Sequence, residues 1–516
     1  MDSPTIRPGS TTPSVTNASP AAAVFRENCE TNYADEYRGS LYNPGAAHLP
    51  SRSSILQMRA ATGVAPTGTA PAGSSSTLNS AGLDPARRPS DPRPGSIDTT
   101  NPQVGTAQDP PSLSAGTTKS PVFLGTEAQY FQEARNVIAN AQPGDMICAQ
   151  MYEFQNADTN PESHGATASP GYADQQAILP ELAAAANRGV KVNLVLDASK
   201  NEKTHEIANQ PIVDYLNQNA GASGNMTIDY YPPETVNIDH AKELVHMTPD
   251  GQGGYQVQEA LAGGTNWGNH TAANDDGGGI FYGRDAVGAG QIFFRDQAFC
   301  RGDRTSAPNP VADETGPVEW RTTSPSQEGG GAAGIRDAQL QIANQSDNVY
   351  VDTFCLNHPG LLQALEAKGS NAFVRVDPGE RKVNSPGLDD IRSSGGTAMW
   401  ANVDAHPNTM AGQLNHEKLL LGETGGVATA AAIGSANQTN SGFESTREVV
   451  DPSTGRKRTE KTNHEIDAIV TRESGPDGYS TAPFLDAMDA KIHNDFANNS
   501  LQDPPSHTGG TQPGQF

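Results

Sequence analysis

Apolar positions begin to recur at regular spacing after about residue 120. The segment TEAQYFQEARNVIANAQPGD (126–145) has helical spacing and ends at a Pro-Gly pair, so it predicts a helix. The run MICAQMYEF (146–154) predicts a strand, AILPELAAAANRGV (177–190) a second helix, and VKVNLVLDAS (190–199) a strand that ends near Asp197. This order of helix, strand, helix and strand indicates an α/β sheet.

The same order recurs about 200 residues later. The expected elements are a helix at 335–348, a strand at 349–356, a helix at 360–369 and a strand at 372–377. The tripeptide Ile-Ala-Asn also occurs twice, each time at the end of the first helix of the group. The repetition predicts a two-lobed, duplicated α/β fold.

The predicted halves are residues 121–310 and 333–500, joined by a linker at 311–332. Residues 1–120 are rich in Ser, Thr, Pro and Gly and show no lasting apolar period, so we expect a disordered tail there and at 501–516. The whole chain carries 34 basic and 59 acidic residues, a net charge of −25. Basic and acidic residues are equal in number in the tail, so the halves hold the whole acidic excess, which disfavours extended nucleic acid as a partner.

No apolar run approaches the roughly 18 residues of a membrane-spanning helix, so we expect no integral membrane segment. The N-terminus also lacks the basic and apolar regions of a conventional secretory signal. The four cysteines show no metal-binding spacing, and Cys148 and Cys355 lie in apolar runs typical of buried free thiols.

A short polar motif stands at the same place in each half. In the first half HAK (240–242) is followed by GGTN (263–266), and in the second HEK (416–418) is followed by GSAN (434–437). Two residues apart on a strand, His and Lys project to one face, and a Gly-rich turn lets an Asn approach that face closely. The residues predicted to carry the chemistry are His240, Lys242, Asn266, His416, Lys418 and Asn437.

Two imidazoles and two ammonium groups in one pocket suit a single phosphodiester. One His can attack phosphorus and form a phosphohistidine, while the other protonates the leaving alkoxide and then activates water or an alcohol. The Lys and Asn side chains would neutralise charge on the phosphoryl oxygens. Such a site needs neither a metal nor a cofactor, and we expect none.

The paired motif resembles the phospholipase D superfamily, whose mark is a duplicated His-x-Lys-x4-Asp followed by Gly-(Gly/Ser)-x-Asn. The resemblance covers roughly residues 121–500. It implies one α/β/α sandwich per half, one active site between the halves, His240 as the nucleophile and His416 as the general acid and base. The Asp position of the motif is held by Met247 and by Glu423, and MTPDGQGGYQ (247–256) predicts a longer hairpin than usual.

Members of the superfamily also place an acid after each Asn to hold the imidazole. In this chain the resemblance implies Asp276, rather than Asp275, in the first half. It implies Glu448 in the second half, with Glu465 as the competing residue. Residues expected to line the substrate site are Gly264, Thr265, Trp267, Ser435 and Glu423, although Trp267 could instead simply pack.

The resemblance implies a phospholipase D-type phosphodiesterase that hydrolyses glycerophospholipids, or transfers their phosphatidyl group, giving phosphatidic acid and free alcohol. We expect it to act at a membrane surface, as a monomer. The alternatives are a nuclease or tyrosyl-DNA-type phosphodiesterase of the same superfamily, and a catalytically inactive scaffold or effector protein. The N-terminus resembles the non-cleaved leaders of bacterial proteins exported by specialised routes, and the competing prediction is a regulatory tail on a cytoplasmic enzyme.

Overall fold

The computed structural model describes residues 111–503. The gaps within that range are 157–158, 160–168, 201–206, 234, 269–270, 304–310, 313–315, 324–333, 403–413, 444–446, 451–456 and 461. Of the predicted tails, residues 1–110 and 504–516 lie outside the described residues.

The first half is built on one mixed sheet with the strand order β2-β8-β7-β6-β3-β4-β5. The three strands at one end, β3, β4 and β5, are parallel and are connected by helices, whereas the remaining neighbours in this order pair antiparallel. The strands are β2 (Val122–Leu124), β3 (Met146–Met151), β4 (Lys191–Leu196), β5 (Met226–Tyr230), β6 (Lys242–Pro249), β7 (Tyr255–Gly263) and β8 (Gly278–Tyr282).

The second half repeats this order strand for strand. Its sheet has the order β19-β13-β12-β11-β14-β15-β18-β10-β9, so that β10 to β13 correspond to β2 to β5 of the first half. The strands are β9 (Val311–Ala312), β10 (Val318–Thr323), β11 (Asn348–Thr353), β12 (Ala372–Val376), β13 (Thr397–Ala401), β14 (Lys418–Thr424), β15 (Val427–Gly434), β18 (Glu465–Thr471) and β19 (Ser500–Leu501). The predicted duplicated α/β fold is confirmed.

Four of the helices fall where the apolar spacing predicted them. They are α2 (Glu127–Asn140), α3 (Tyr172–Arg188), α6 (Gly334–Gln345) and α7 (Pro359–Lys368). The sequence did not predict α4 (Gln210–Ala220), α5 (Val287–Cys300), α8 (Arg381–Ser393) or α10 (Ala482–Asn498). In α5 the reason is physical, because most of this helix is buried and the partly exposed stripe at Val287, Gln291 and Arg295 is too narrow to give a clear period.

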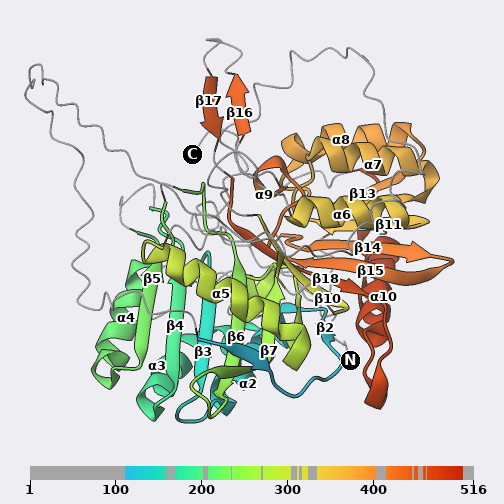
Figure 1. Cartoon of the computed structure of the whole chain (residues 1–516). Coiled ribbons are helices and arrows are strands. Elements are labelled where there is room, and N and C mark those ends of the chain that lie inside the picture. The colour runs from blue at the N-terminus through green and yellow to red at the C-terminus, as the bar shows by residue number, and fades with distance from the viewer. Residues whose placement is uncertain are drawn as a thin grey trace, which may run out of the picture. The chain divides into compact units, whose positions relative to one another are not determined.

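Alternating side chains of the strands feed separate cores. Ile147 and Leu244 pack under α2, α3 and α4, while their neighbours Cys148 and Val245 point into a central core with α5 and α10. Leu419 of the second half joins the same central core, and a third core lies under α6, α7 and α8. In Figure 1 these two helix groups lie on the outer sides of their sheets. The halves therefore share one core and are not joined by a linker alone.

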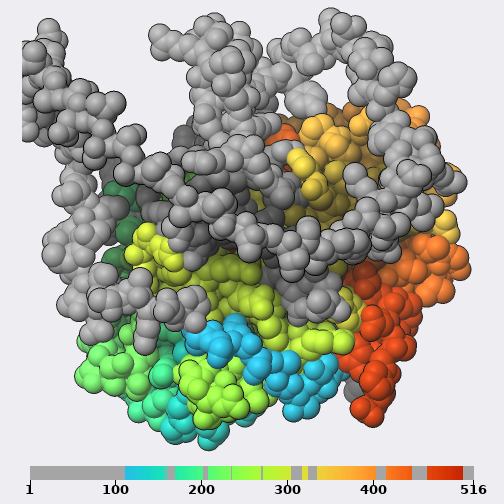
Figure 2. Space-filling view, viewed as in Figure 1, coloured from blue at the N-terminus to red at the C-terminus, as the bar shows by residue number. Residues whose placement is uncertain are grey.

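Two predicted boundaries need correction. The supposed tail reaches residue 120, yet β1 (Leu113–Ala115) pairs in parallel with β7, and Figure 2 shows these first described residues, in blue, against the first half. The supposed linker contains β10, an antiparallel partner of β18. This pairing assigns the segment to the second half. Trp320 of β10 is fully buried and donates its indole N–H across to the Asp285 carbonyl of the first half at 2.7 Å.

Two other expectations were tested by the described residues. Cys148 and Cys355 are buried and neither forms a disulfide, in agreement with the prediction. In the described parts of the chain, no helix combines the length and apolar character needed to cross a bilayer.

Candidate active site

Each His-x-Lys motif is tied to the opposite half by its backbone. The His240 amide donates to the carbonyl of His464 at 2.8 Å, and the His416 amide donates to the carbonyl of Asp275 at 2.8 Å. His464 immediately precedes β18 of the second half, and Asp275 lies just before β8 of the first. Because β8 and β18 are equivalent strands, the two cross-connections are related by the duplication.

A carboxylate from the opposite half holds each imidazole. Nδ1 of His240 lies 2.8 Å from Oε2 of Glu465, and Nδ1 of His416 lies 2.7 Å from Oδ2 of Asp276. All four side chains are buried. A carboxylate partner makes Nδ1 the donor, so each ring takes the tautomer whose Nε2 carries the lone pair.

The acid beside His240 is Glu465, the competing residue of the sequence prediction, and not Glu448. Glu465 opens β18, the strand that pairs with β15 beside the second motif's turn. Glu448 lies instead on β16 (Arg447–Val450), opposite Thr459 of β17 (Lys457–Glu460) in a separate two-stranded sheet. The side chain of Glu448 lies outside the described residues. Asp276, predicted for the first half, is the residue placed against His416.

The two lysines lie beside the histidines. Lys242 Nζ donates to the carbonyl of His240 at 2.8 Å, and Lys418 Nζ donates to the carbonyl of His416 at 2.8 Å. Lys418 Nζ also lies 3.1 Å from both ring nitrogens of His416. Each ammonium group is thus fixed next to the imidazole of its own motif.

An aromatic ring that the sequence analysis did not single out covers each motif. Tyr152 lies 5.1 Å from the His240 ring and 5.3 Å from Lys242 Nζ, measured to the ring centroid. Phe354 lies 5.4 Å from the His416 ring, with Lys418 Nζ 5.9 Å from its centroid. Both residues come one position after the first parallel strand of their half, and that repetition was the available signal.

The turn residues support the carboxylates. A Cβ on Gly264 would lie 2.4 Å from Asp276 Oδ1, so only Gly lets that acid approach. Ser435, the equivalent residue, donates its hydroxyl to Glu465 Oε2 at 2.6 Å. Thr265 is buried beside them and Asn266 and Asn437 end the two turns, both buried. The predicted turn residues therefore lie with the histidine and carboxylate pairs.

Trp267 and Glu423 do not join this group. The indole of Trp267 is fully buried in the core under α2, α3 and α4, edge-to-face with Phe154 at 5.1 Å. Glu423 lies five residues beyond Lys418 on β14, about 17 Å along an extended strand. The equivalent Met247 is buried in the central core. At the Asp position of the motif, Met247 therefore packs in the core and Glu423 lies toward the far end of β14, so neither side chain contacts the imidazoles of the two motifs.

Two further acids fix the backbone just before each motif. Asp197 Oδ2 accepts from the amide of Asp239 at 2.7 Å, and Asp377 Oδ2 accepts from the amide of Asn415 at 2.7 Å. Each acid directly follows the second parallel strand of its half, at the position where the sequence predicted that this strand ends. Burial raises the pKa of Asp377 to about 6 although the Asn415 amide opposes the shift. These are positioning residues, because they act through the motif backbone.

The residue that precedes each orienting carboxylate in the sequence belongs to a buried ion pair. In the first half this residue is an acid that contacts basic groups, and in the second half it is a histidine that contacts an acid. Next to Asp276, the Asp275 carboxylate is paired with Arg375 at 2.9 Å and with Lys491 at 3.1 Å. Next to Glu465, His464 contacts Asp296 at 2.6 Å. Burial alone would lower the pKa of His464, but Asp296 raises it to about 9.

The raised pKa of His464 predicts a loss of stability in mild alkali. An unfolded His has a pKa of about 6.5, so the stabilisation is complete below about pH 6.5 and is lost as the pH rises through about 9. It amounts to at most about 3 kcal/mol. The free energy of unfolding, measured from pH 6 to 10, should fall more in the wild type than in His464→Gln. Parallel curves would show that His464 does not bind this proton.

The position of Glu465 predicts a clear difference between two glutamates. Glu465→Gln removes the charge that orients His240 and should lower kcat by about 10²–10⁴-fold. Glu448→Gln is the matched control and should stay within about 2-fold of the wild type. Steady-state rates of both variants decide between the two acids, and a larger loss in Glu448→Gln would contradict the geometry.

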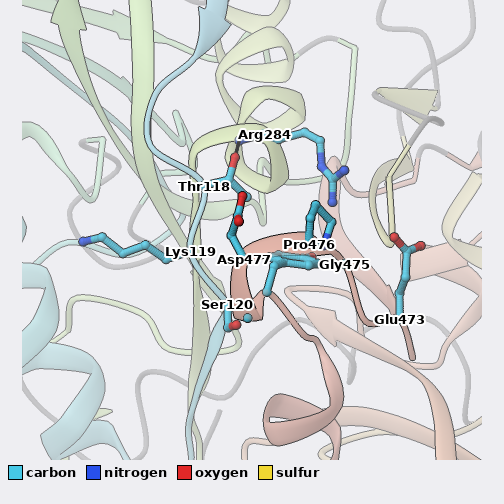
Figure 3. A pocket seen from close by; sticks show the side chains of 10 residues that line it. Thr118, Lys119, Ser120, Arg284, Glu473, Gly475, Pro476 and Asp477 are labelled. Atoms are coloured by element: carbon cyan, nitrogen blue, oxygen red, sulfur yellow. Dashed lines mark hydrogen bonds between the residues drawn. The ribbon is translucent and has the colours of Figure 1, made fainter.

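The described residues also line a cavity of about 480 Å³ that lies elsewhere. Figure 3 shows it between the 118–120 segment, Arg284 and the 473–479 loop. None of the residues predicted to do the chemistry lines it.

No protein-family model matches the chain, and no curated protein sequence matches it significantly. Solved structures similar to it include a phosphatidylserine synthase from Haemophilus influenzae (13% identity, 75% of this chain and 88% of that chain, TM-score 0.48). Others are Nuc, a phospholipase D family member from Salmonella typhimurium (14%, 36% and 98%, 0.24), and a polyphosphate kinase from Porphyromonas gingivalis (12%, 77% and 61%, 0.40). These likenesses carry no information on the substrate of this chain.

The duplicated sheets, with a His-x-Lys motif at the same place in each, define the fold of the protein. The chain has the phospholipase D-like fold that the motif resemblance implied, with two α/β halves and the motifs brought together between them.

Proposed function

We propose that the protein is a phosphodiesterase or phosphotransferase that works through a phosphohistidine intermediate. The observation that carries the proposal is the crossed arrangement of two imidazoles, each held at Nδ1 by a carboxylate from the other half. That arrangement provides two Nε2 atoms for the reaction, one on each of two buried imidazoles whose Nδ1 atoms are held by carboxylates. Two such groups are what a double displacement at phosphorus requires.

In the first step Nε2 of His240 attacks phosphorus. A P–N bond forms and the P–O bond to the leaving alcohol breaks. His416 enters this step as an imidazolium, protonated at both ring nitrogens, and passes its Nε2 proton to the departing oxygen. Glu465 stabilises the positive charge that develops on the His240 ring. His240 is assigned this role by the resemblance to the superfamily, and the geometry of the two imidazoles is compatible with it.

In the second step His416 takes a proton from water or from an alcohol, whose oxygen attacks phosphorus and breaks the P–N bond. Lys242, Lys418, Asn266 and Asn437 neutralise charge on the non-bridging oxygens as the trigonal-bipyramidal transition states form. Water gives hydrolysis, and an alcohol gives transfer. The same residues serve both outcomes.

A glycerophospholipid is the substrate class we propose. The net charge of −25 opposes the approach of a long polyanion, whereas one phosphodiester needs only the local Lys and His groups. The motif resemblance to phospholipases D points in the same direction. The products would be phosphatidic acid and a free headgroup alcohol.

A substrate panel tests this proposal. The purified full chain is given phospholipid vesicles with different headgroups, with and without a primary alcohol, and in parallel plasmid DNA at low salt. Headgroup release together with a phosphatidyl-alcohol product supports the proposal. DNA nicking without lipid cleavage would replace the substrate by nucleic acid, and no product from either would favour an inactive scaffold. His240→Gln controls for contaminating activity in each assay.

A further inference from the structure

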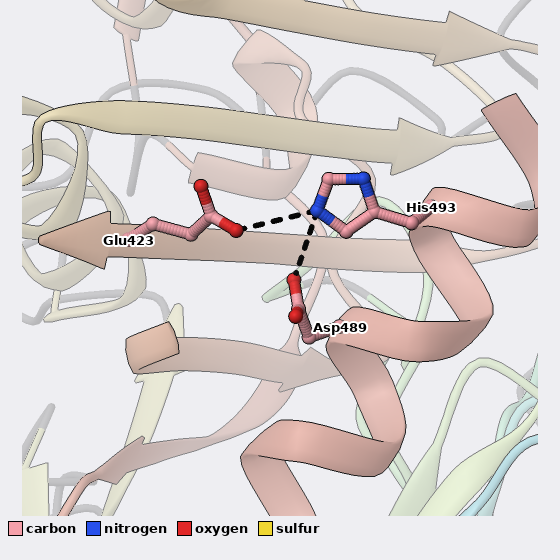
Figure 4. Close-up of side chains that lie close together, drawn as sticks. All are labelled: Glu423, Asp489 and His493. Carbon is pink, nitrogen blue, oxygen red and sulfur yellow. Dashed lines mark hydrogen bonds and ion pairs between the residues drawn. The ribbon is translucent and has the colours of Figure 1, made fainter. Parts of the chain in front are cut away.

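A second cluster of side chains lies at the far end of β14, away from the two imidazoles. Glu423 from β14 and two residues of α10, Asp489 and His493, bring one ligand atom each to within 4.8 Å of one another. Figure 4 shows one ring nitrogen of His493 directed at both carboxylates. An imidazole nitrogen with two carboxylate oxygens is a metal-ligating set that catalysis at the histidines does not use.

The distances in the cluster are also those expected between neighbouring ligands of one metal ion. Nε2 of His493 lies 3.3 Å from Glu423 Oε1 and 3.3 Å from Asp489 Oδ1. Ligand bonds of about 2.1 Å in a tetrahedral zinc site separate neighbouring ligand atoms by about 3.4 Å. Asp489 Oδ1 has almost no accessible surface, although the Asp489 side chain is 28% exposed, and its 3.3 Å contact with His493 Nε2 is an ion pair without hydrogen-bond geometry. A buried carboxylate oxygen in that condition is suited to a cation.

Neighbouring groups hold two of the ligands in place. Asn348 donates to Glu423 Oε2 at 2.8 Å, which leaves Oε1 directed at His493. The strand register shifts between Gly422 and Glu423, and such a bulge re-aims the side chain. The His493 ring packs edge-on against Tyr350 at 4.8 Å. Support of this kind is typical of the outer shell of metal sites.

We propose that Glu423, Asp489 and His493 bind one divalent transition-metal ion, for which Zn²⁺ is the best fit. The imidazole ligand disfavours Mg²⁺ and Ca²⁺, which prefer oxygen ligands throughout. His493 is 49% exposed, so the ion can enter from solvent and complete its coordination with water. The ion would clamp α10 to β14 and is separate from the phosphodiester chemistry.

Metal binding is measured on the full chain after dialysis against EDTA. Zn²⁺ is titrated in competition with a chromophoric chelator, and Co²⁺ is added separately to follow its visible absorption. We expect one Zn²⁺ per chain, a Tm that rises with Zn²⁺, and visible Co²⁺ bands typical of low coordination number. Asp489→Asn and His493→Gln should each weaken Zn²⁺ binding at least about 10-fold.

Asp486→Asn is the matched control, because this acid lies on the same helix, 61% exposed, and pairs with Arg472. It should bind Zn²⁺ as the wild type does. Equal binding by the wild type, Asp489→Asn and His493→Gln would place the ion elsewhere and overturn the proposal. Absence of one-equivalent binding in the wild type would also overturn it and leave the cluster as an ion pair. Neither result depends on lipid cleavage.

Discussion

Replacing either His240 or His416 by Gln should lower phosphodiester turnover by at least about 10⁴-fold, because both imidazoles are required in a double displacement. The double variant should be no slower than the slower single variant, since the two groups act as one unit. Initial rates with the best substrate of the panel measure this. The expected loss is in kcat, with the fold preserved.

His246→Gln is the matched histidine control. His246 also lies on β6, but it pairs with Asp145 at 3.1 Å and Glu259 at 3.2 Å, remote from Glu465 and Asp276 along the strand. Its activity should stay within about 2-fold of the wild type, and the Tm of the two active-site variants should remain close to that of the wild type. If His240→Gln retained substantial turnover, the proposed nucleophile would be excluded.

Arg375→Met should be the most destabilising single change in the second half. The guanidinium is fully buried and contacts Asp352 at 2.7 Å, Asp275 at 2.9 Å and Asn415 at 3.2 Å. Burial alone would lower the pKa of the Arg375 guanidinium, but Asp352 and Asp275 outweigh burial and raise the pKa above its ordinary value. Removing one partner of such a network leaves buried charges uncompensated, which costs about 3–5 kcal/mol.

Denaturant unfolding measures this loss, and Arg336→Met provides the comparison. Arg336 is partly exposed and pairs with the exposed Asp337, so its replacement should change the free energy of unfolding by less than about 1 kcal/mol. Arg375→Met should also lower activity in the folded fraction, because Asp275 holds the backbone of His416. Equal stability of the two variants would contradict the proposed importance of the buried network.

The repeated pattern predicted the fold well and the site in part. Both His-x-Lys motifs and their Gly-rich turns could be selected because the duplication offers each position twice. Asp276 is selected by its spacing from the turn at Gly283 and not by the repeat. The choice between Glu448 and Glu465 could not be made from the sequence, because it depends on which later strand lies next to β15 in the sheet. A hairpin inserted between β15 and β18 displaces the acid in sequence without displacing it in space.

Other parts of the site could not be predicted because they arise from contacts between distant segments. Nothing local to Glu465 says that it serves His240 of the opposite half. Trp267 stands beside Asn266, yet it turns into the core because strand-like alternation directs neighbouring side chains to opposite sides. Tyr152 and Phe354 do stand at equivalent positions, so a residue-by-residue comparison of the two halves could have found them.

The most direct test of the proposed chemistry is to trap the intermediate in His416→Gln. A phosphodiester with a p-nitrophenol leaving group needs no proton on departure, so the first step can proceed while the second stalls. We expect a burst of one nitrophenolate per chain and a phosphoryl adduct on His240, located by mass spectrometry of peptides. An adduct on another residue, or steady turnover with His240 replaced, would contradict the assignment of His240 as the nucleophile.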